Sequence, residues 1–183
     1  MTDPVEIPVI RTIAVLGGTG KEGKGLAYRW AKAGYRVLIG SRLEEKALAA
    51  AEELRAMIRE PETIVGMTNE LAARQADLVV ITVPYSAHAS MCEQMREFVQ
   101  GKIVIDVTVP LVPPKVTKVQ MPAAGSATQE AQKIFGESVQ VVAAFQNISY
   151  EHLLHDEELN CDVLVCGGNK SSRQVVLKLV ADA

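Results

Sequence analysis

Short apolar runs alternate with amphipathic stretches along most of the chain. Runs such as "IAVL" and "DLVVITV" are continuously apolar, which is typical of parallel strands buried on both faces. They predict strands at residues 12–16, 36–39, 63–67, 77–83, 102–107, 139–144 and 162–166. The stretches between them predict helices at residues 22–33, 43–59, 70–75, 87–99, 128–135, 151–156 and 171–180. This alternation predicts an α/β fold: a Rossmann-like, doubly wound, mostly parallel sheet with helices on both faces.

Length, composition and charge are those of one soluble domain. The 183 residues are 48% hydrophobic and 22% charged, enough to form a core without a disulfide or metal. The net charge of −3 argues against a nucleic-acid or membrane-surface binder. No apolar run reaches the roughly 18 residues of a membrane span, and the first residues do not resemble a secretory signal. The stretch 108–122 holds four prolines and predicts an extended loop near a ligand or partner.

The cysteines favour a reducing compartment. Cys92, Cys161 and Cys166 are odd in number and lack the spacing of a zinc site. We therefore expect reduced thiols in a cytoplasmic protein.

A glycine-rich turn follows the first predicted strand. Gly18-Thr19-Gly20-Lys21-Glu22-Gly23 matches G-x-G-x-x-G and lies between a buried strand and a helix, where a dinucleotide site requires it. Gly18 would permit the tight turn, Gly20 the approach of a pyrophosphate, and Gly23 the close packing of helix on strand. The helix N-terminus would attract the phosphates. The alternative is a structural turn without a ligand.

The end of the second predicted strand favours NADP over NAD. An NAD site usually places an acid there to bind the ribose 2′-hydroxyl, but this chain has Ser41 and Arg42 and no acid before Glu44. Arg42 would clamp a 2′-phosphate, Ser41 would donate a hydrogen bond, and Lys46 would add a second cation. In the alternative, Arg42 and Lys46 are solvated charges paired with Glu45.

The carboxyl ends of the later strands supply candidates for the second half of the site, because ligands of open α/β sheets bind beyond those ends. Val83, Pro84 and Tyr85 follow the fourth strand and would lie beside the nicotinamide. His88 would face the pocket, with a structural role as the more common alternative. After the fifth strand, Asp106 is either a site residue or a strand-end cap.

Further candidates with small or polar side chains suit the approach of a flat ring, although they also suit a plain turn. They are Thr108, Ala144, Gln146, Asn147 and Ile148.

The arrangement of reactive residues favours hydride transfer. His152 and His155 are spaced to share a metal, but no Cys or carboxylate completes that site, so we predict none. No Ser-His-Asp, Cys-His or paired-carboxylate arrangement stands out, and no catalytic side chain is assigned. In hydride transfer the cofactor carries the chemistry and the protein holds two rings face to face.

Four blocks of the sequence resemble the NADPH-dependent deazaflavin reductases, also called F-420:NADP oxidoreductases. The blocks, in the family's order, are "LGGTGKEGKGLAYRWAKAGYRVLIGSRLEEKA", "ITVPYSAH", "VVAAFQNISYEHL" and "CDVLVCGGNKSSRQVVLKL". The resemblance implies reversible hydride transfer between NADPH and the deazaflavin coenzyme F-420, also written F420, in a homodimer.

The resemblance also implies roles for individual residues. Thr19, Ser41, Arg42 and Lys46 would hold the adenosine phosphate end, while Val83, Pro84 and residues 144–148 would frame the stacked rings. Some family members carry a histidine at the position of Gln146, so no imidazole role transfers there.

We interpret residues 1–183 as one NADP-binding Rossmann domain with a dinucleotide-binding core at about 1–150. Residues 151–183 would begin a smaller C-terminal portion, shortened here because relatives usually continue past the equivalent of Val180. Two alternatives to the deazaflavin reductase stay open: an NADPH-dependent flavin or ferric reductase, and a non-catalytic NADP-binding redox sensor.

Overall fold

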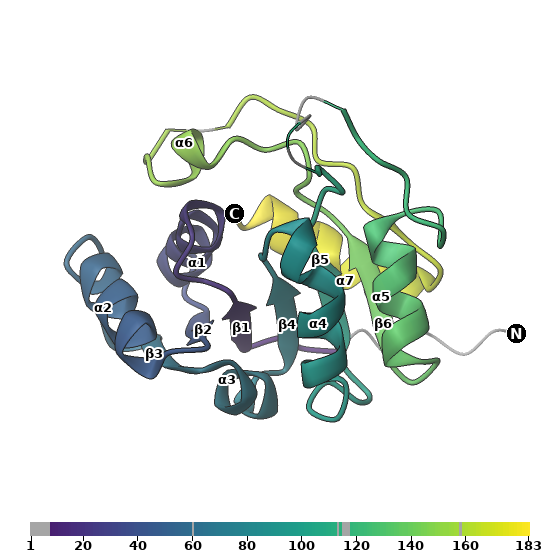
Figure 1. Cartoon of the computed structure of the whole chain (residues 1–183). Coiled ribbons are helices and arrows are strands. Elements are labelled where there is room, and N and C mark those ends of the chain that lie inside the picture. The colour runs from purple at the N-terminus through teal and green to yellow at the C-terminus, as the bar shows by residue number, and fades with distance from the viewer. Residues whose placement is uncertain (1–7, 60, 113, 115–117, 158) are drawn as a thin grey trace, which may run out of the picture.

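The computed structural model of the chain describes residues 8–59, 61–112, 114, 118–157 and 159–183. Its main element is a seven-stranded sheet of order β3-β2-β1-β4-β5-β6-β7 (Figure 1). The strands are β1 (Thr12–Leu16), β2 (Arg36–Ser41), β3 (Ile64–Thr68), β4 (Leu78–Ile81), β5 (Ile103–Asp106), β6 (Gln140–Ala143) and β7 (Cys166–Gly167). β1 to β6 pair in parallel and β7 is antiparallel. The predicted α/β, doubly wound fold is confirmed.

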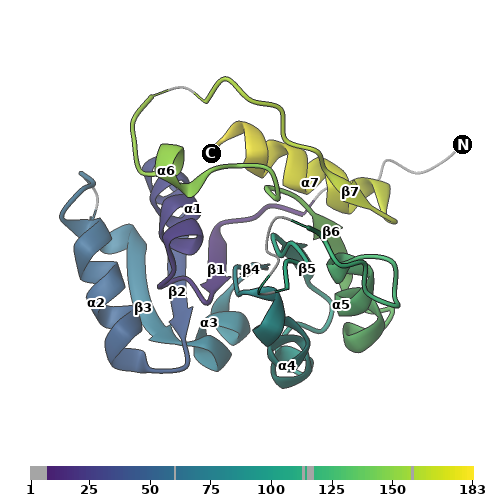
Figure 2. The ribbon, with the colours of Figure 1, turned by 45° about the horizontal axis from the view of Figure 1, so that its top comes forward.

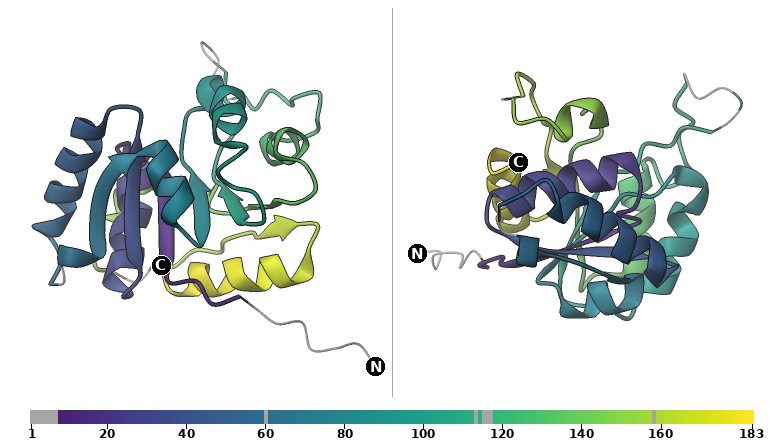
Figure 3. Two further views of the ribbon diagram at one scale, coloured as in Figure 1. Left: turned by 90° about the horizontal axis from the view of Figure 1, so that it is seen from below. Right: turned by 90° about the vertical axis from the view of Figure 1, so that its left-hand side faces the viewer.

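Helices cover both faces of the sheet. They are α1 (Lys21–Lys32), α2 (Glu44–Arg55), α3 (Asn69–Gln75), α4 (Tyr85–Met95), α5 (Ala127–Phe135), α6 (Tyr150–Leu153) and α7 (Lys170–Ala181), with a short 3-10 turn, η1 (Pro61–Thr63). Figure 2 shows α1 and α7 above the sheet and α3, α4 and α5 below it, and α7 also lies opposite α4 and α5 in the left view of Figure 3. Within the described residues, no helix is both long and apolar enough to cross a bilayer.

The two cores follow from the alternation of side chains along each buried strand. In β1, Ile13 and Val15 pack with α1, α2 and α7, whereas Ala14 and Leu16 pack with α3, α4 and α5. α7 is anchored to α1 by Trp30, whose buried indole donates a 2.9 Å hydrogen bond to the carbonyl of Leu179. Each of the strands β1 to β6 therefore contributes to both layers, which is why these strands are mostly apolar.

Several predicted elements end earlier or are shorter in the structure. The helix predicted at 87–99 ends at Met95, and the helix predicted at 151–156 ends at Leu153. The run 162–166 was expected to form a strand, but β7 contains only Cys166–Gly167, because pairing with β6 is limited to Val142 and Ala143. Before β7 the chain is irregular and Leu164 is 72% exposed. The helix predicted at 43–59 ends at Arg55, whose guanidinium instead donates to the carbonyl of Ile64 in β3.

The proline-rich stretch contains no helix or strand among its described residues, apart from one isolated bridge between Leu111 and Val119. Residues 113 and 115–117 of this predicted loop lie outside the described part of the chain.

The contact between α2 and β3 leaves no space for a side chain at Gly66. A Cβ built there would lie 2.3 Å from the backbone oxygen of Ala47, which cannot rotate away. We expect Gly66→Ala to lower the free energy of unfolding by about 1–3 kcal/mol, measured by denaturant titration. Gly168→Ala is the control, since a Cβ on this exposed glycine meets nothing within 4 Å. Equal losses in both variants would contradict the packing argument.

Candidate functional site

The glycine turn after β1 lies in close contact with the start of α1, and both lie close to the end of β4. Gly17 has a φ of +71°, the left-handed conformation that favours glycine. A Cβ on Gly23 would lie 2.6 Å from the Cα of Gly18 and 2.7 Å from the Oγ1 of Thr82, just beyond β4. The residue of the turn with a positive φ is thus Gly17, one position before the motif, while Gly23 lets α1 pack closely, as its predicted role requires.

A cleft of about 510 Å³ opens beside this turn, across the boundary between β1 and β4 where the direction of chain progression along the sheet reverses. Ligands of doubly wound sheets bind at this switch point. The lining residues are Gly17, Thr19, Gly20, Ser41, Arg42, Leu43, Lys46, Asn69, Thr82, Val83, Pro84, Ser86, Ala87, Ser90, Met91 and Gln94. Seven predicted site residues therefore meet in one cavity: Thr19, Gly20, Ser41, Arg42, Lys46, Val83 and Pro84.

One end of the cleft carries two cations. Arg42 and Lys46 are exposed, and neither forms an ion pair with any described residue, Glu45 included. Ser41 is buried beside them, and its hydroxyl accepts a hydrogen bond from the N–H of Leu43. None of the described lining residues carries a carboxyl group. This end is therefore suited to a phosphorylated ligand.

Other lining residues were missed from the sequence. Asn69 is buried at the start of α3, and its Oδ1 accepts a 3.3 Å hydrogen bond from the N–H of Gly17. Ser86, Ser90 and Gln94 form a polar stripe on α4, with Gln94 donating to Ser90 at 2.9 Å. Their spacing of four residues is a signal that helical periodicity could have identified. No local signal exists for Asn69, because its partner is 52 positions away.

Lys21 and Glu22 lie outside the cleft lining. The Lys21 ammonium is 3.2 Å from the Tyr150 hydroxyl and 4.6 Å from the centre of its ring, so it is directed towards α6. The Oε1 atom of Glu22 is buried and has no hydrogen-bond partner among the described residues. Burial raises the pKa of Glu22 from 4.5 to about 7.

The residues expected near the second substrate meet at the ends of β5 and β6. Thr108 is buried and its N–H donates to the Asp106 Oδ1 at 3.1 Å, while the side-chain amide of Gln146 donates to the Asp106 carbonyl at 2.7 Å. Ala144 is also fully buried. His88 is fully buried with its Nε2 3.2 Å from the Asp106 Oδ2, which supports the structural alternative over substrate contact. Tyr85 stacks on His88 with ring centres 6.1 Å apart.

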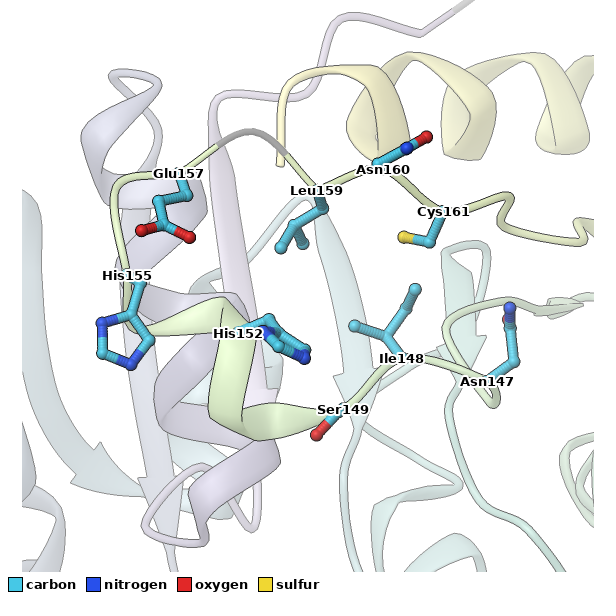
Figure 4. A pocket seen from close by; sticks show the side chains of 9 residues that line it. All are labelled: Asn147, Ile148, Ser149, His152, His155, Glu157, Leu159, Asn160 and Cys161. Atoms are coloured by element: carbon cyan, nitrogen blue, oxygen red, sulfur yellow. The ribbon is translucent and has the colours of Figure 1, made fainter.

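A second cavity of about 420 Å³ lies along the segment that follows β6 (Figure 4). It is lined by Asn147, Ile148, Ser149, His152, His155, Glu157, Leu159, Asn160 and Cys161. Ile148 and Leu159 point towards one another across it in Figure 4. His152 and His155 are exposed, and among the described residues no three His, Cys, Asp or Glu side chains gather to hold a metal.

Sequence comparison assigns the chain to a family. Residues 12–110 match the sequence model described as "NADP oxidoreductase coenzyme F420-dependent". The F420-dependent NADP reductase of Methanocaldococcus jannaschii is 38% identical over 174 residues, covering 91% of this chain and 77% of that protein. The chain belongs to the F420-dependent NADP oxidoreductase family. A second F420-dependent NADP reductase, from Methanothermobacter thermautotrophicus, is 38% identical over 93% of this chain and 76% of its own length.

Solved structures agree with the fold of this oxidoreductase family. A putative F420-dependent NADP reductase from Arthrobacter sp. FB24 superposes with a TM-score of 0.76 at 21% identity, covering 96% of this chain and 82% of that one. Plasmodium falciparum pyrroline carboxylate reductase with NADP bound gives 0.61 at 15% identity, covering 97% and 56%. At these identities the likeness shows a shared fold.

The residues matched by the family model line one of the two cavities and not the other. Every residue that lines the cleft lies within the matched residues 12–110, whereas the second cavity lies wholly beyond them. The cleft is thus part of the region by which F420-dependent NADP oxidoreductases are recognised.

The buried carboxyl of Glu22 makes stability depend on pH. Because its pKa in the folded protein is about 7 against 4.5 unfolded, the folded state binds more protons between these values, and its stability falls as pH rises through them. We expect Glu22→Gln to be more stable than wild type by about 1–2 kcal/mol at pH 8, after allowance for partial exposure, and to gain little at pH 4. Thermal unfolding at both pH values measures the difference.

Glu70→Gln is the control, because Glu70 also lies in the first turn of a helix but is exposed. A pH-independent gain in Glu22→Gln, or the same gain in Glu70→Gln, would refute this account of Glu22.

Proposed function

We infer that this protein is an oxidoreductase that transfers a hydride reversibly between NADPH and the deazaflavin coenzyme F420. The observation that carries this inference is the 38% identity to proteins named F420-dependent NADP reductase over most of the chain. These names do not favour the flavin or ferric reductase, nor the non-catalytic redox sensor.

The cleft fits NADP on two grounds. Arg42 and Lys46 offer cations without ion-pair partners in the described structure, next to the Ser41 hydroxyl, and the lining holds no carboxylate that would repel a 2′-phosphate. Gly20 caps α1 without a side-chain hydrogen bond, which leaves the helix N-terminus open to the pyrophosphate next to Thr19.

The nicotinamide then lies beyond β4, β5 and β6. Val83 and Pro84 line the cleft there, and the buried Ala144 and Thr108 close the edge of the sheet. The bound NADPH supplies the hydride, and the residues of this chain orient the two rings and exclude water. Gln146, Asn147 and Ile148 form the side from which F420 approaches, and the cavity bounded by Asn147 and Ile148 offers it space.

We also propose a homodimer, which the family resemblance implies, in the cytoplasm. The three cysteines are all free thiols, in keeping with a reducing compartment. Analytical ultracentrifugation measures the oligomeric state.

We expect Arg42→Ala to raise the Michaelis constant for NADPH about 10–100-fold and to leave that for NADH nearly unchanged, since only NADPH carries the 2′-phosphate. Steady-state kinetics with both coenzymes test this. Arg36→Ala is a matched control, because Arg36 is exposed at the opposite end of the same strand. An equal loss for NADPH and NADH in Arg42→Ala would refute the assignment.

Mixing the protein with NADPH and purified F420 tests the reaction itself. Loss of the deazaflavin absorbance at a steady rate is the expected result, with NADP as the oxidised product. Turnover with flavin or ferric iron alone would overturn the choice of acceptor, and binding of NADPH without any turnover would favour the redox sensor.

A further inference from the structure

A buried pair of ionisable side chains lies behind the nicotinamide end of the cleft. His88 on α4 and Asp106 at the end of β5 are both 0% exposed, and their Nε2 and Oδ2 atoms are 3.2 Å apart. Neither residue lines a described cavity. Burying charge is costly even when it is paired, and apolar residues would often fill the same space with no loss of stability. The pair therefore calls for an explanation beyond packing.

The surroundings of His88 favour its charged form. Asp106 faces it from β5 and Glu130 from α5, with the Glu130 Oε2 3.5 Å from the Nδ1. On α4 itself, Tyr85 stacks on the ring and the Cys92 thiol lies 3.8 Å from the Nε2. Burial works against the charge, but the hydrogen bonds and charges of the two carboxylates outweigh it, and the pKa of His88 is raised.

Asp106 joins the ends of three adjacent strands. Its Oδ1 accepts from the Thr108 N–H, and its carbonyl accepts from the Gln146 side chain at 2.7 Å and from the Ala144 N–H at 3.4 Å. The Thr108 hydroxyl in turn donates to the carbonyl of Val83 at 3.4 Å. The Asp106 carboxylate thus holds the segment after β5, and its backbone carbonyl holds the segment after β6. Thr108 extends this chain of hydrogen bonds to the segment after β4.

The backbone after β6 is strained at the same place. Phe145, between Ala144 and Gln146, has a φ of +69°, and among the described residues it is the one non-glycine residue with a positive φ. Such strain persists only where surrounding contacts enforce it, and it is concentrated at functional sites. Here it accompanies the turn of the chain that brings the Gln146 amide back to Asp106.

We propose that Asp106, held by His88, is a positioning residue that fixes Val83, Thr108 and Gln146 around the nicotinamide during hydride transfer. The inference rests on the proposed function. The affinity for NADPH would come mainly from the phosphate end of the cleft, and the His88–Asp106 pair would instead set the distance and angle between the two rings. Misplacement of reacting groups by about 1 Å can cost on the order of 100-fold in rate.

The test separates binding from the hydride step in His88→Gln, Glu130→Gln and wild type. Stopped-flow reduction of F420 at saturating NADPH gives the hydride-transfer rate from pH 5 to 9, and fluorescence titration gives the dissociation constant and the emission of the bound nicotinamide. We expect His88→Gln to lower the rate about 10–100-fold, with a less than threefold change in the dissociation constant. The wild-type rate should fall as the pH rises above 6.5 and His88, whose pKa is raised, loses its proton. This pH-dependent fall should be absent in His88→Gln.

Glu130→Gln keeps the test decisive if His88→Gln fails to fold, since the Glu130 side chain is 29% exposed and its amide variant has the same size. Without the Glu130 carboxylate the pKa of His88 should be lower, so the fall in the hydride-transfer rate should begin at lower pH. Glu93→Gln, on the exposed face of α4, is the control and should match wild type.

A rate that is unchanged in Glu130→Gln and His88→Gln, or a dissociation constant that rises in parallel with the loss of rate, would overturn the proposal. If wild type fails to reduce F420, the proposed function fails. The positioning role is then still decided by the emission of bound NADPH, which should change with pH in wild type and not in His88→Gln.

Discussion

The site depends on a close contact of α1 that only a glycine at position 23 can make. α1 rests on the turn after β1 and against the end of β4 through Gly23, with no space for a Cβ between Gly23, Gly18 and the Thr82 hydroxyl. This approach places the helix N-terminus at the switch point of the sheet and opens the cleft between β1 and β4. A bulkier residue would push α1 outward, so the shape of the cleft and the packing of the core are set by the same contact.

We assign cofactor binding and hydride transfer to opposite sides of the contact between α1 and the glycine turn. On the β2 side, Arg42 and Lys46 have no ion-pair partners within the described chain. A bound phosphate would therefore not compete with a carboxylate for either cation. On the β5 side, the side chains of His88 and Asp106 are buried and paired with each other, with Nε2 and Oδ2 3.2 Å apart. Under the proposed function, the exposed cations would bind the phosphate of the cofactor, and the buried pair would hold the backbone around its nicotinamide.

The sequence predicted the elements that local pattern determines and missed those that depend on distant partners. The strands around β1 and β4 were identified because both of their faces are buried, which makes every residue apolar. The strand expected at 162–166 was wrong because its length is set by how much of β6 it can reach, which the run "DVLVC" does not encode. Asn69 and the pairing of His88 with Asp106 likewise depend on contacts across 52 and 18 positions.

The end of β5 shows how side chains can pair the backbone groups at the end of a parallel strand. Strand ends leave carbonyl and N–H groups unpaired, and a buried group without a partner costs about 1–3 kcal/mol. At β5 these groups are paired by side chains: the Asp106 carboxylate takes the Thr108 N–H, and the Gln146 amide takes the Asp106 carbonyl. A dry edge strengthens every electrostatic interaction near it. Under the proposed function, the buried His88–Asp106 pair and the strained Phe145 would serve to hold this edge fixed while a hydride is transferred.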